Sequence, residues 1–589
     1  MASVRRTYPC AFLATLLAMA SISEATPGFL ARMNRNVVAQ ELLTEITALL
    51  GHGTKHKRLV HLEDVMRPMY MSLPRQKDGG IAPGVARYAL NRYFSAHRGW
   101  YLTGIAQSGE RWNESSSTTE MLKSKMPSFL IENLEEHIAH KRLGLEELAV
   151  LAATVEDLVY SDTLELLTMA YGAYNLSMNE ELTEREAKRV INTFMLFHLN
   201  PWTWPSWNNS KALAAHLRTA HKDNPAWTET MLWVEDLKGA IKYQDRVEHN
   251  PFLSREVYFG SYPSMVHLVE QVIDGYGLFQ DLQCRELKNA MMDLETQERN
   301  DGRVLLANFY RPYMQGTHQF FVERPEYLKA LGSLDDSDPK QPSVIVPNYL
   351  YGRSFCVGTE NGFQSFCCVD QCNVLMETLE RSIAHPVASP SLIAELVAAL
   401  PTETVAAPRN LSISLRHKLD KIAEANGGHV PLHGRLFSQW LHHAFPNECP
   451  QPRAPGVTEA PMTHDEWRAR RNSSTQVPKK VFEQLEDLAS KAEGPACQNE
   501  TCMSWTQEEE LVSDIIDLRA LGSPRAEWPQ VQGHRLRRTL HCLAMCGAVA
   551  ALIAILFDSL RPSRSILWPQ VAKKSPSGTD GHSSMVYVF

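Results

Sequence analysis

The chain has 589 residues, with 59 lysines and arginines against 67 aspartates and glutamates, and this length allows two or three domains. Its apolar fraction of 44% and charged fraction of 21% are ordinary for a globular protein. The net charge of −8, with no stripe of basic residues interleaved with aromatics, argues against a nucleic-acid partner, because phosphate binding needs concentrated positive charge.

The first element is a signal peptide, predicted over residues 1–20. Arg5 and Arg6 supply a charged start, an apolar run follows from Cys10 to Met19, and Ala18 and Ala20 form a small-x-small cleavage signal. The alternative is an uncleaved anchor, but the run is short for a bilayer span. Cleavage would place the following residues in the secretory pathway.

Residues 21–251 are expected to form a helical domain. Thr183, with Glu186 three residues later, predicts a capping box at the start of its last helix. Two tryptophans between Pro201 and Pro205 interrupt the pattern, and an irregular stretch is expected from there to about residue 251. Apolar residues recur at three-to-four spacing in 37–50, 83–94, 128–142, 145–160, 161–174 and 183–199.

Residues 252–450 are expected to form a second helical domain that carries a loop-rich insertion. The insertion is predicted over 332–366, where Asp, Pro, Ser, Gly and aromatic residues replace the helical pattern. Helical patterns occupy 265–279, 284–296, 373–384, 391–399, 413–426 and 433–444.

Cysteines indicate an oxidising compartment, because eight of the eleven lie between the predicted signal peptide and the apolar segment 539–557, and an even number suits disulfides. Neighbouring Cys367 and Cys368 cannot easily bond each other, so each is expected in a separate bridge. We predict three disulfides among the first six cysteines and a fourth between Cys497 and Cys502. A redox-active Cys367–Cys368 pair is the alternative. The eight are Cys284, Cys356, Cys367, Cys368, Cys372, Cys449, Cys497 and Cys502.

The C-terminal region predicts a membrane anchor. Residues 451–538, rich in Pro, Glu, Ser and Arg, are expected to be a stalk or linker. Residues 539–557 are almost entirely apolar and would reach about 28 Å as a helix, close to the thickness of a bilayer. A buried core helix is the alternative. With a cleaved signal peptide, the tail 558–589 would be cytosolic and the N-terminal part luminal or extracellular. Six glycosylation sequons support this weakly: Asn113, Asn175, Asn208, Asn410, Asn472 and Asn499.

A helix–loop–helix pattern with one apolar loop residue recurs four times. The apolar residues are Ile81, Leu182, Val304 and Val430, and in three copies a glycine lies two residues earlier. This arrangement resembles the EF-hand, in which a glycine permits the sharp loop turn and loops pair through a short β contact. The pattern predicts that Ile81 pairs with Leu182, and Val304 with Val430.

Only the second copy carries plausible calcium ligands, because the other three lack the glutamate that completes a calcium shell. In the second, Glu186 falls at the last ligand position, although no turn glycine or aspartate is present. An ordinary capped helix start is the alternative, and a glycan on Asn175 would obstruct binding. The candidate ligands are Asn175, Ser177, Asn179, Thr183 and Glu186.

Three histidines lie on or beside one predicted helix and are candidate metal ligands: His433, His442 and His443. His442 and His443 point in different directions on a helix, so at most one can join His433. Solvated or capping histidines are the preferred interpretation. No nucleophile elbow, P-loop or dinucleotide fingerprint occurs, so no catalytic residue is assigned.

Five stretches resemble a large set of predicted proteins from dinoflagellate algae, and the resemblance covers about residues 59–450. It implies a shared helical, cysteine-containing ectodomain and transfers no catalytic residue. The stretches are LGLEELAVLAATVEDLVYSD, FQDLQCRELKNAM, SFCCVDQCNVL, LPTETVAAPRNLS and LDKIAEANGGHVPLHGRLFSQWLHHAFPNECP.

Together these patterns predict a mainly α protein with two EF-hand-like helix–loop–helix pairs, a disulfide-bearing insertion in the second, and one C-terminal transmembrane helix. The expected function is that of a membrane-tethered, non-catalytic ectodomain that binds a protein partner or serves a structural role. No cofactor other than calcium is expected. The alternatives are a calcium-responsive EF-hand-like protein and a secreted hydrolase or thiol oxidoreductase.

Overall fold

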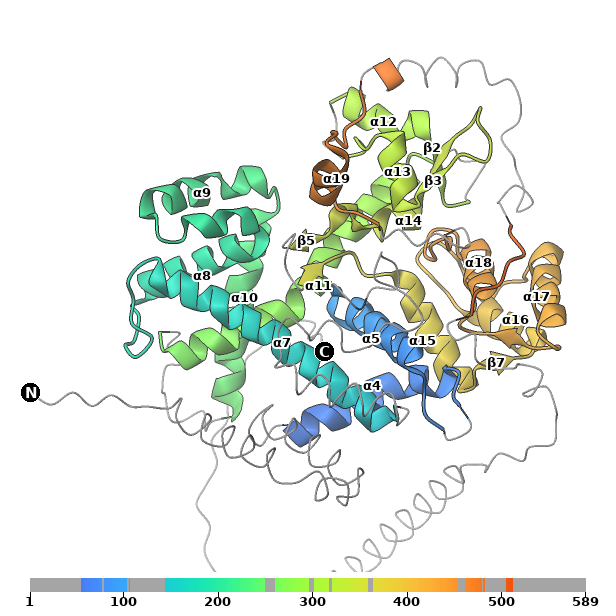
Figure 1. Cartoon of the computed structure of the whole chain (residues 1–589), viewed down its shortest axis with the longest axis horizontal. Helices are drawn as coiled ribbons and strands as arrows, with labels where there is room; N and C mark the ends of the chain where they lie inside the picture. Colours follow the sequence, from blue (N-terminus) through green and yellow to red (C-terminus); the bar gives the residue numbers. More distant parts are fainter. Residues whose placement is uncertain are drawn as a thin grey trace, which may run out of the picture. The chain divides into compact units, whose positions relative to one another are not determined.

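The structure, a computed structural model, is mainly α-helical, as the sequence predicts (Figure 1). It describes residues 55–76, 79–102, 105, 143–248, 260–295, 301–316, 320–358, 364–453, 461–478, 480–482 and 505–511. The predicted signal peptide, transmembrane helix and tail lie outside these residues, as do Cys497 and Cys502. Among the helices that are described, none is long and apolar enough to cross a bilayer.

The predicted helices at 83–94, 145–174 and 183–199 are present, whereas those expected at 37–50 and 128–142 lie outside the described residues and the first described helix, over 55–72, was not predicted. The two stretches expected at 145–160 and 161–174 are one continuous helix of 28 residues, which packs against α4, α8 and α11. The capping box predicted at Thr183 is present, since Glu186 and Thr183 exchange hydrogen bonds at the start of α8. The elements are α4 (Lys55–Ser72), α5 (Pro83–Arg98), β1 (Trp100–Leu102), α7 (Leu145–Gly172), α8 (Glu184–Leu199) and η2 (Pro201–Ser206).

The prediction of an irregular stretch from Pro205 to about residue 251 is wrong, because two helices occupy most of it. These are α9 (Ser210–Asp223) and α10 (Trp227–Glu248). The side chain of Asn209 accepts from the Ala212 N–H and caps α9. The core-facing residues of α9 do follow three-to-four spacing, at Leu213, Leu217 and Ala220, and those of α10 do so at Trp227, Met231, Val234, Leu237 and Ile241.

The second half begins with α11 (Tyr262–Met292), one 31-residue helix where the sequence predicted two. The stretch 332–366, expected to be loop-rich, contains a series of short elements. Strands of two or three residues show no alternation that a sequence pattern could reveal. The elements are β2 (Arg303–Leu305), α12 (Leu306–Met314), α13 (Pro325–Leu331), β3 (Leu334–Asp335), β4 (Ser343–Ile345), α14 (Val346–Leu350), η3 (Arg353–Phe355), β5 (Val357–Gly358) and β6 (Gln364–Phe366).

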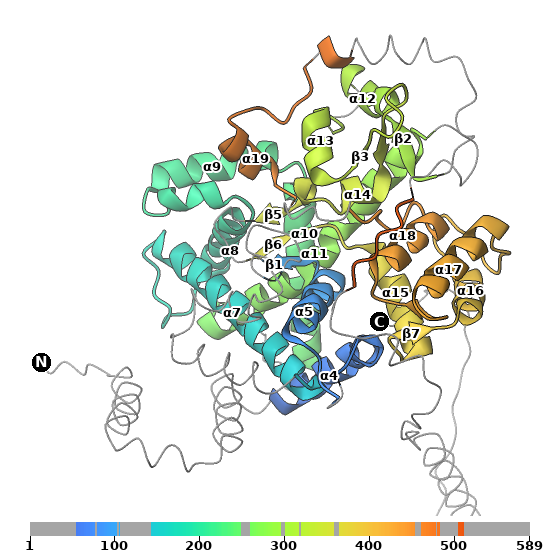
Figure 2. The same ribbon diagram turned by 45° about the vertical axis from the view of Figure 1, so that its right-hand side comes forward.

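Four helices that the sequence predicts lie together near the end of the described chain, α15 to α18 (Figures 1 and 2). A short helix, α19, follows within the region expected to be a stalk, and its Trp467 packs on Tyr327 with ring centroids 5.3 Å apart. The elements are α15 (Gln371–Ile383), β7 (Val387–Ala388), α16 (Pro390–Ala399), α17 (Ile413–Ala425), β8 (Val430–Pro431), α18 (Arg435–Ala444) and α19 (His464–Arg471).

The strands form three small antiparallel sheets, ordered β1-β6-β5, β2-β4-β3 and β7-β8. In the first, Trp100 pairs with Phe366, which joins chain segments more than 260 positions apart. Figure 2 shows these three strands stacked beside α8 and α11.

The four loop residues of the repeat do pair with other loops, but not in the predicted combinations. Ile81 forms an antiparallel bridge with Leu143, not with Leu182. Val304 pairs with Val344, and Val430 with Ala388. The Leu182 N–H donates to the Gly260 carbonyl over 2.9 Å. The partners Leu143, Val344 and Ala388 have no glycine two residues earlier, so the sequence pattern could not identify their loops.

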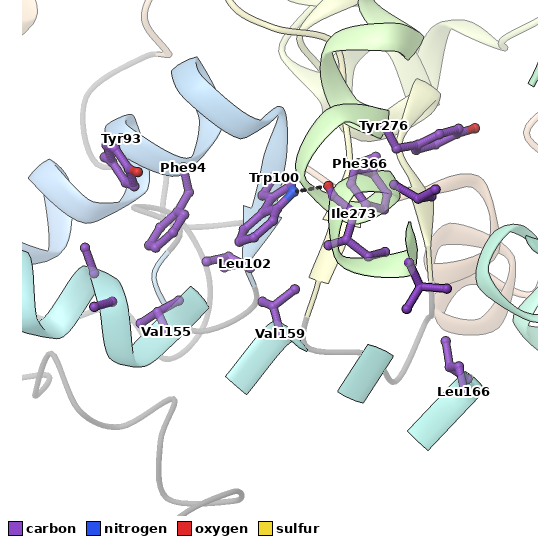
Figure 3. Packing of buried hydrophobic residues seen from close by; sticks show 14 of the residues in the cluster. Tyr93, Phe94, Trp100, Leu102, Val155, Val159, Leu166, Ile273, Tyr276 and Phe366 are labelled. Atoms are coloured by element: carbon purple, nitrogen blue, oxygen red, sulfur yellow. Dashed lines mark hydrogen bonds between the residues drawn. The ribbon is translucent and has the colours of Figure 1, made fainter. Parts of the chain in front are cut away.

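The largest buried cluster lies between α5, α7 and α11 (Figure 3). Phe94 stacks on Trp100 with centroids 5.6 Å apart, and the Trp100 indole N–H donates to the Ile273 carbonyl over 3.3 Å. Gly99 and Gly277 let two backbones meet here, because a Cβ at Gly99 would lie 2.9 Å from the Gly277 Cα. The positive φ of Gly99, 64°, also suits the helix end that it forms.

Candidate functional site

Six cysteines form three disulfides, and Cys367 and Cys368 are in different bridges, as predicted. Cys356–Cys367 closes a short loop of separation 11 at the β5–β6 hairpin. Cys284–Cys368 and Cys372–Cys449 close long loops of separation 84 and 77. They tie the start of α15 to α11 and to the chain after α18. The predicted fourth bridge lies outside the described residues.

A buried ion pair lies beside two of these bridges. The ammonium of Lys288, one turn after Cys284 on α11, donates to Glu448 Oε1 over 3.2 Å and to Gln371 Oε1 over 2.6 Å. Gln371 and Glu448 are the chain neighbours of Cys372 and Cys449. Both charged side chains are no more than 3% exposed. Lys288 therefore connects the same segments as the disulfides.

The candidate calcium loop forms a capped helix start. The Glu186 carboxylate accepts from the Thr183 N–H over 2.9 Å and from the Thr183 hydroxyl over 2.6 Å. These bonds lower the pKa of Glu186. Asn175 is exposed with φ of 52°, and the Asn179 N–H donates to the Ser177 hydroxyl over 3.2 Å. The capped alternative is present, and calcium binding at Asn175, Ser177, Asn179, Thr183 and Glu186 stays a prediction.

The histidines are buried, which corrects the expectation that they are solvated. His433 connects α4 and α5 to the loop before α18: its Nε2 lies 3.0 Å from the Ser72 hydroxyl, and its Nδ1 lies 3.1 Å from the Tyr88 hydroxyl. Because Ser72 donates to the Met69 carbonyl over 2.8 Å, it accepts from Nε2–H, and Tyr88 donates to Nδ1. Burial holds the pKa of His433 well below its usual value, so the ring stays neutral.

A charged pair extends this hydrogen-bond network around His433. Arg92 on α5 pairs with Glu380 on α15, and Glu380 Oε1 lies 3.5 Å from His433 Nε2. A serine, a histidine and a carboxylate meet here, but both the serine and the carboxylate face the same ring nitrogen. A catalytic triad needs them on opposite nitrogens. The network around His433 is therefore a set of buried hydrogen bonds between elements, and it lacks triad geometry.

The other two histidines are held separately. His442 Nδ1 donates to the Cys449 carbonyl over 2.7 Å, while its Nε2 accepts from Arg303 Nη1 over 3.2 Å. His443 Nδ1 lies 3.0 Å from the Lys418 ammonium. Within the part of the chain that the structure describes, no group of three or more His, Cys, Asp or Glu side chains could hold a metal ion.

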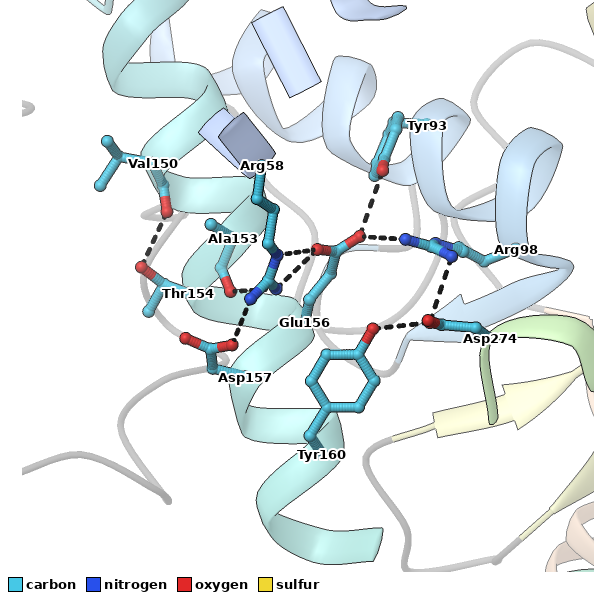
Figure 4. Close-up of polar contacts among 10 residues, drawn as sticks. All are labelled: Arg58, Tyr93, Arg98, Val150, Ala153, Thr154, Glu156, Asp157, Tyr160 and Asp274. Carbon is cyan, nitrogen blue, oxygen red and sulfur yellow. Dashed lines mark hydrogen bonds and ion pairs between the residues drawn. The ribbon is translucent and has the colours of Figure 1, made fainter. Parts of the chain in front are cut away.

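The most extensive charged network centres on Glu156 of α7 (Figure 4). Arg58 donates to Glu156 Oε2 from Nε over 3.0 Å and from Nη2 over 2.6 Å, and Arg98 Nη2 donates to Oε1 over 3.0 Å. Arg98 also pairs with Asp274 of α11 over 3.1 Å. Burial raises the pKa of Asp274, although the Arg98 guanidinium opposes this. The network links α4, α5, α7 and α11.

Sequence reasoning missed both charged centres. Glu156 and its neighbour Asp157 lie in a stretch of α7 that is otherwise almost entirely apolar, LAVLAATVEDLV, and this adjacent pair of carboxylates is the one available signal. Lys288 carries no comparable signal, because its helix alternates charged and apolar residues. The chain was compared with protein-family models, with curated proteins and with solved structures, and none of them matches it. The resemblance to algal proteins stays a prediction.

Proposed function

We propose that the described residues form the luminal or extracellular part of a membrane-tethered protein that binds a partner or serves a structural role without catalysis. The observation that carries this is the set of three disulfides, which suits an oxidising compartment. The buried charges support it further. Glu156 and Lys288 are bonded to side chains of neighbouring elements, and such bonds hold helices together.

We further propose that the repeated helix–loop–helix units are degenerate EF-hand-like packing modules. A packing role is supported by the short backbone contact that each of the four loop residues makes with another segment, but none of the four pairs with another loop of the repeat as two EF-hands would. A module of this kind pairs loops to fix helix directions without needing a metal. Calcium titration of the purified ectodomain tests it, and a thermal unfolding midpoint that does not change with calcium is expected. A rise of several degrees that Glu186→Gln abolishes would favour the calcium-responsive alternative.

Surface positions of the sequons support the topology. Asn175, Asn208, Asn410 and Asn472 are all exposed, as attachment of a glycan requires. Expression in a secretory host followed by deglycosylation should reduce the mass, and the four sites should be found by peptide mapping.

In sealed vesicles, added protease should remove only the tail 558–589. Digestion of the ectodomain with an intact tail would overturn the proposal.

A further inference from the structure

A seven-residue segment near the end of the described chain, Trp505 to Leu511, lies extended across α18. It is the red-orange trace that passes α18 in Figure 1. Leu511 forms an antiparallel bridge with Gly434, and the Arg435 N–H donates to the Glu510 carbonyl over 2.9 Å. The segment therefore makes strand-like backbone hydrogen bonds with the loop before α18, as a bound extended peptide would.

The first turn of α18 has no capping side chain of its own, since Gly434 is its N-cap. Glu509 supplies the cap, because its Oε1 accepts from the Leu436 N–H over 3.0 Å. A carboxylate at this helix end also meets the positive end of the helix dipole. A Cβ at position 434 would lie 2.9 Å from Glu509 Oε1, so a side chain there would require the carboxylate to shift.

The Arg435 side chain, in the first turn of α18, donates hydrogen bonds to the segment. Its Nη1 donates to the Thr506 hydroxyl over 2.7 Å and to the Glu508 carbonyl over 3.0 Å. With the segment in place Arg435 is 8% exposed, and its Nε donates to the Arg453 carbonyl over 2.9 Å. This geometry favours an occupant that is extended and rich in oxygen acceptors.

An aromatic anchor completes the contact. Trp505 lies edge-on to His443 with centroids 5.4 Å apart, and the Lys418 ammonium lies 5.2 Å from the centre of its ring. Trp505 is partly buried against the apolar cluster of α17 and α18. An aromatic anchor beside a charge-assisted cap is typical of peptide-recognition sites. The groove thus has one position for an aromatic ring and, four residues later, one for a carboxylate.

We propose that this face of α17 and α18 is a recognition groove for an extended acidic peptide, and that residues 505–511 of the same chain occupy it as a tethered, exchangeable ligand. The groove is lined by Lys418, Gly434, Arg435, Leu436, Gln439 and His443. A tethered ligand competes at high effective concentration, so the groove opens to a partner's peptide only when the segment is released. This proposal rests on the proposed binding role, because it names the class of ligand that the protein binds. The contacts that support it do not depend on the membrane topology.

The test uses the full chain and a fluorescent synthetic peptide spanning residues 503–513. The double variant Trp505→Ala/Glu509→Gln should bind this peptide at least about tenfold more tightly than the wild-type chain does, because its own segment competes poorly. A peptide carrying Glu509→Gln should bind at least about fivefold more weakly than the unmodified one, as expected for loss of a charge-assisted cap. A peptide carrying Glu508→Gln is the matched control and should bind normally, because the Glu508 side chain is exposed.

A second measurement leaves the residues of both the segment and the groove unchanged. Protease sites are inserted at positions within 486–495 and 514–520 of the otherwise wild-type chain, and both are cut. The freed segment should co-elute with the chain in size exclusion, and excess synthetic peptide should displace it.

Loss of the segment on cutting, without rebinding, would overturn the proposal. So would a Glu509→Gln peptide that binds as tightly as the unmodified peptide. A concentration-dependent dimer that the synthetic peptide dissolves would mean that copies exchange segments, and would overturn the assignment within one chain. None of these outcomes bears on glycan mapping or vesicle protection, so the proposed topology is judged separately.

Discussion

At the scale of single residues, Glu156 is the charge whose loss should matter most. Glu156→Gln would remove the carboxylate that Arg58 and Arg98 share, although Arg58 keeps Asp157 and Arg98 keeps Asp274. We expect it to lower the free energy of unfolding by about 3 kcal/mol, toward the low end for breaking a buried ion pair, because both arginines remain partly exposed. Urea unfolding of the ectodomain measures this.

Asp157→Asn is the matched control. It removes the neighbouring carboxylate, which is 23% exposed and pairs with Arg58 over 2.7 Å. Partly exposed pairs contribute little, so a loss of about 1 kcal/mol or less is expected. Equal losses in the two variants would show that Glu156 has no central role.

His198 should make the protein sensitive to acid. It is surrounded by Phe194, Tyr276 and Phe366, and burial lowers its pKa to about 4 from 6.5. As the pH falls below 6.5, the unfolded chain binds a proton that the folded chain does not, so stability decreases. Between pH 6.5 and 4 this amounts to about 3 kcal/mol.

The variant His198→Phe keeps a ring in the aromatic cluster and removes the titrating group. The difference in unfolding free energy between this variant and the wild-type chain should therefore grow in favour of the variant as the pH falls from 6.5 toward 4. Urea titrations at several pH values test it, and every other titrating group cancels in the comparison. A constant difference across that range would mean that His198 titrates normally.

At the scale of elements, the crossing of α11 with the end of α5 depends on glycine. A Cβ at Gly277 would meet the Arg98 carbonyl and lie 2.9 Å from the Gly99 Cα. Both are backbone atoms and cannot move aside as a flexible side chain could, so Gly277→Ala should cost about 2 kcal/mol or more. Thermal unfolding should show a clearly lowered midpoint.

Gly239 in α10 provides the comparison on another helix. Nothing lies within 4 Å of the position that its Cβ would take. Gly239→Ala should therefore stabilise the protein by up to about 1 kcal/mol, the difference in helix propensity. If Gly277→Ala were also neutral or stabilising, the two segments would not approach as closely as described.

At the scale of the whole molecule, the disulfides should contribute unequally. Cys372–Cys449 closes a loop of separation 77, and Cys356–Cys367 one of separation 11. Because a longer loop restricts the unfolded chain more, removing the first bridge should cost about 2 kcal/mol more than removing the second. Unfolding of the paired alanine variants, Cys372→Ala/Cys449→Ala and Cys356→Ala/Cys367→Ala, measures the difference, and the opposite order would contradict the chain-entropy account.

The sequence alone determined the local features of this protein. The capping box at Thr183 and Glu186 is formed by residues three positions apart, and amphipathic spacing placed most of the helices because it reflects which face is buried. The separate bridging of Cys367 and Cys368 also followed from their adjacency, since neighbouring side chains diverge.

Only the tertiary structure decided which distant segments meet. Ile81 pairs with Leu143, Lys288 reaches Glu448, and His433 bonds to Ser72, 361 positions away. Such partners are chosen by the packing of whole helices, and no local pattern encodes them. The same holds for the groove beside α18: Glu509 caps a helix 73 positions earlier, and in the sequence it is one of three consecutive glutamates with nothing to distinguish it.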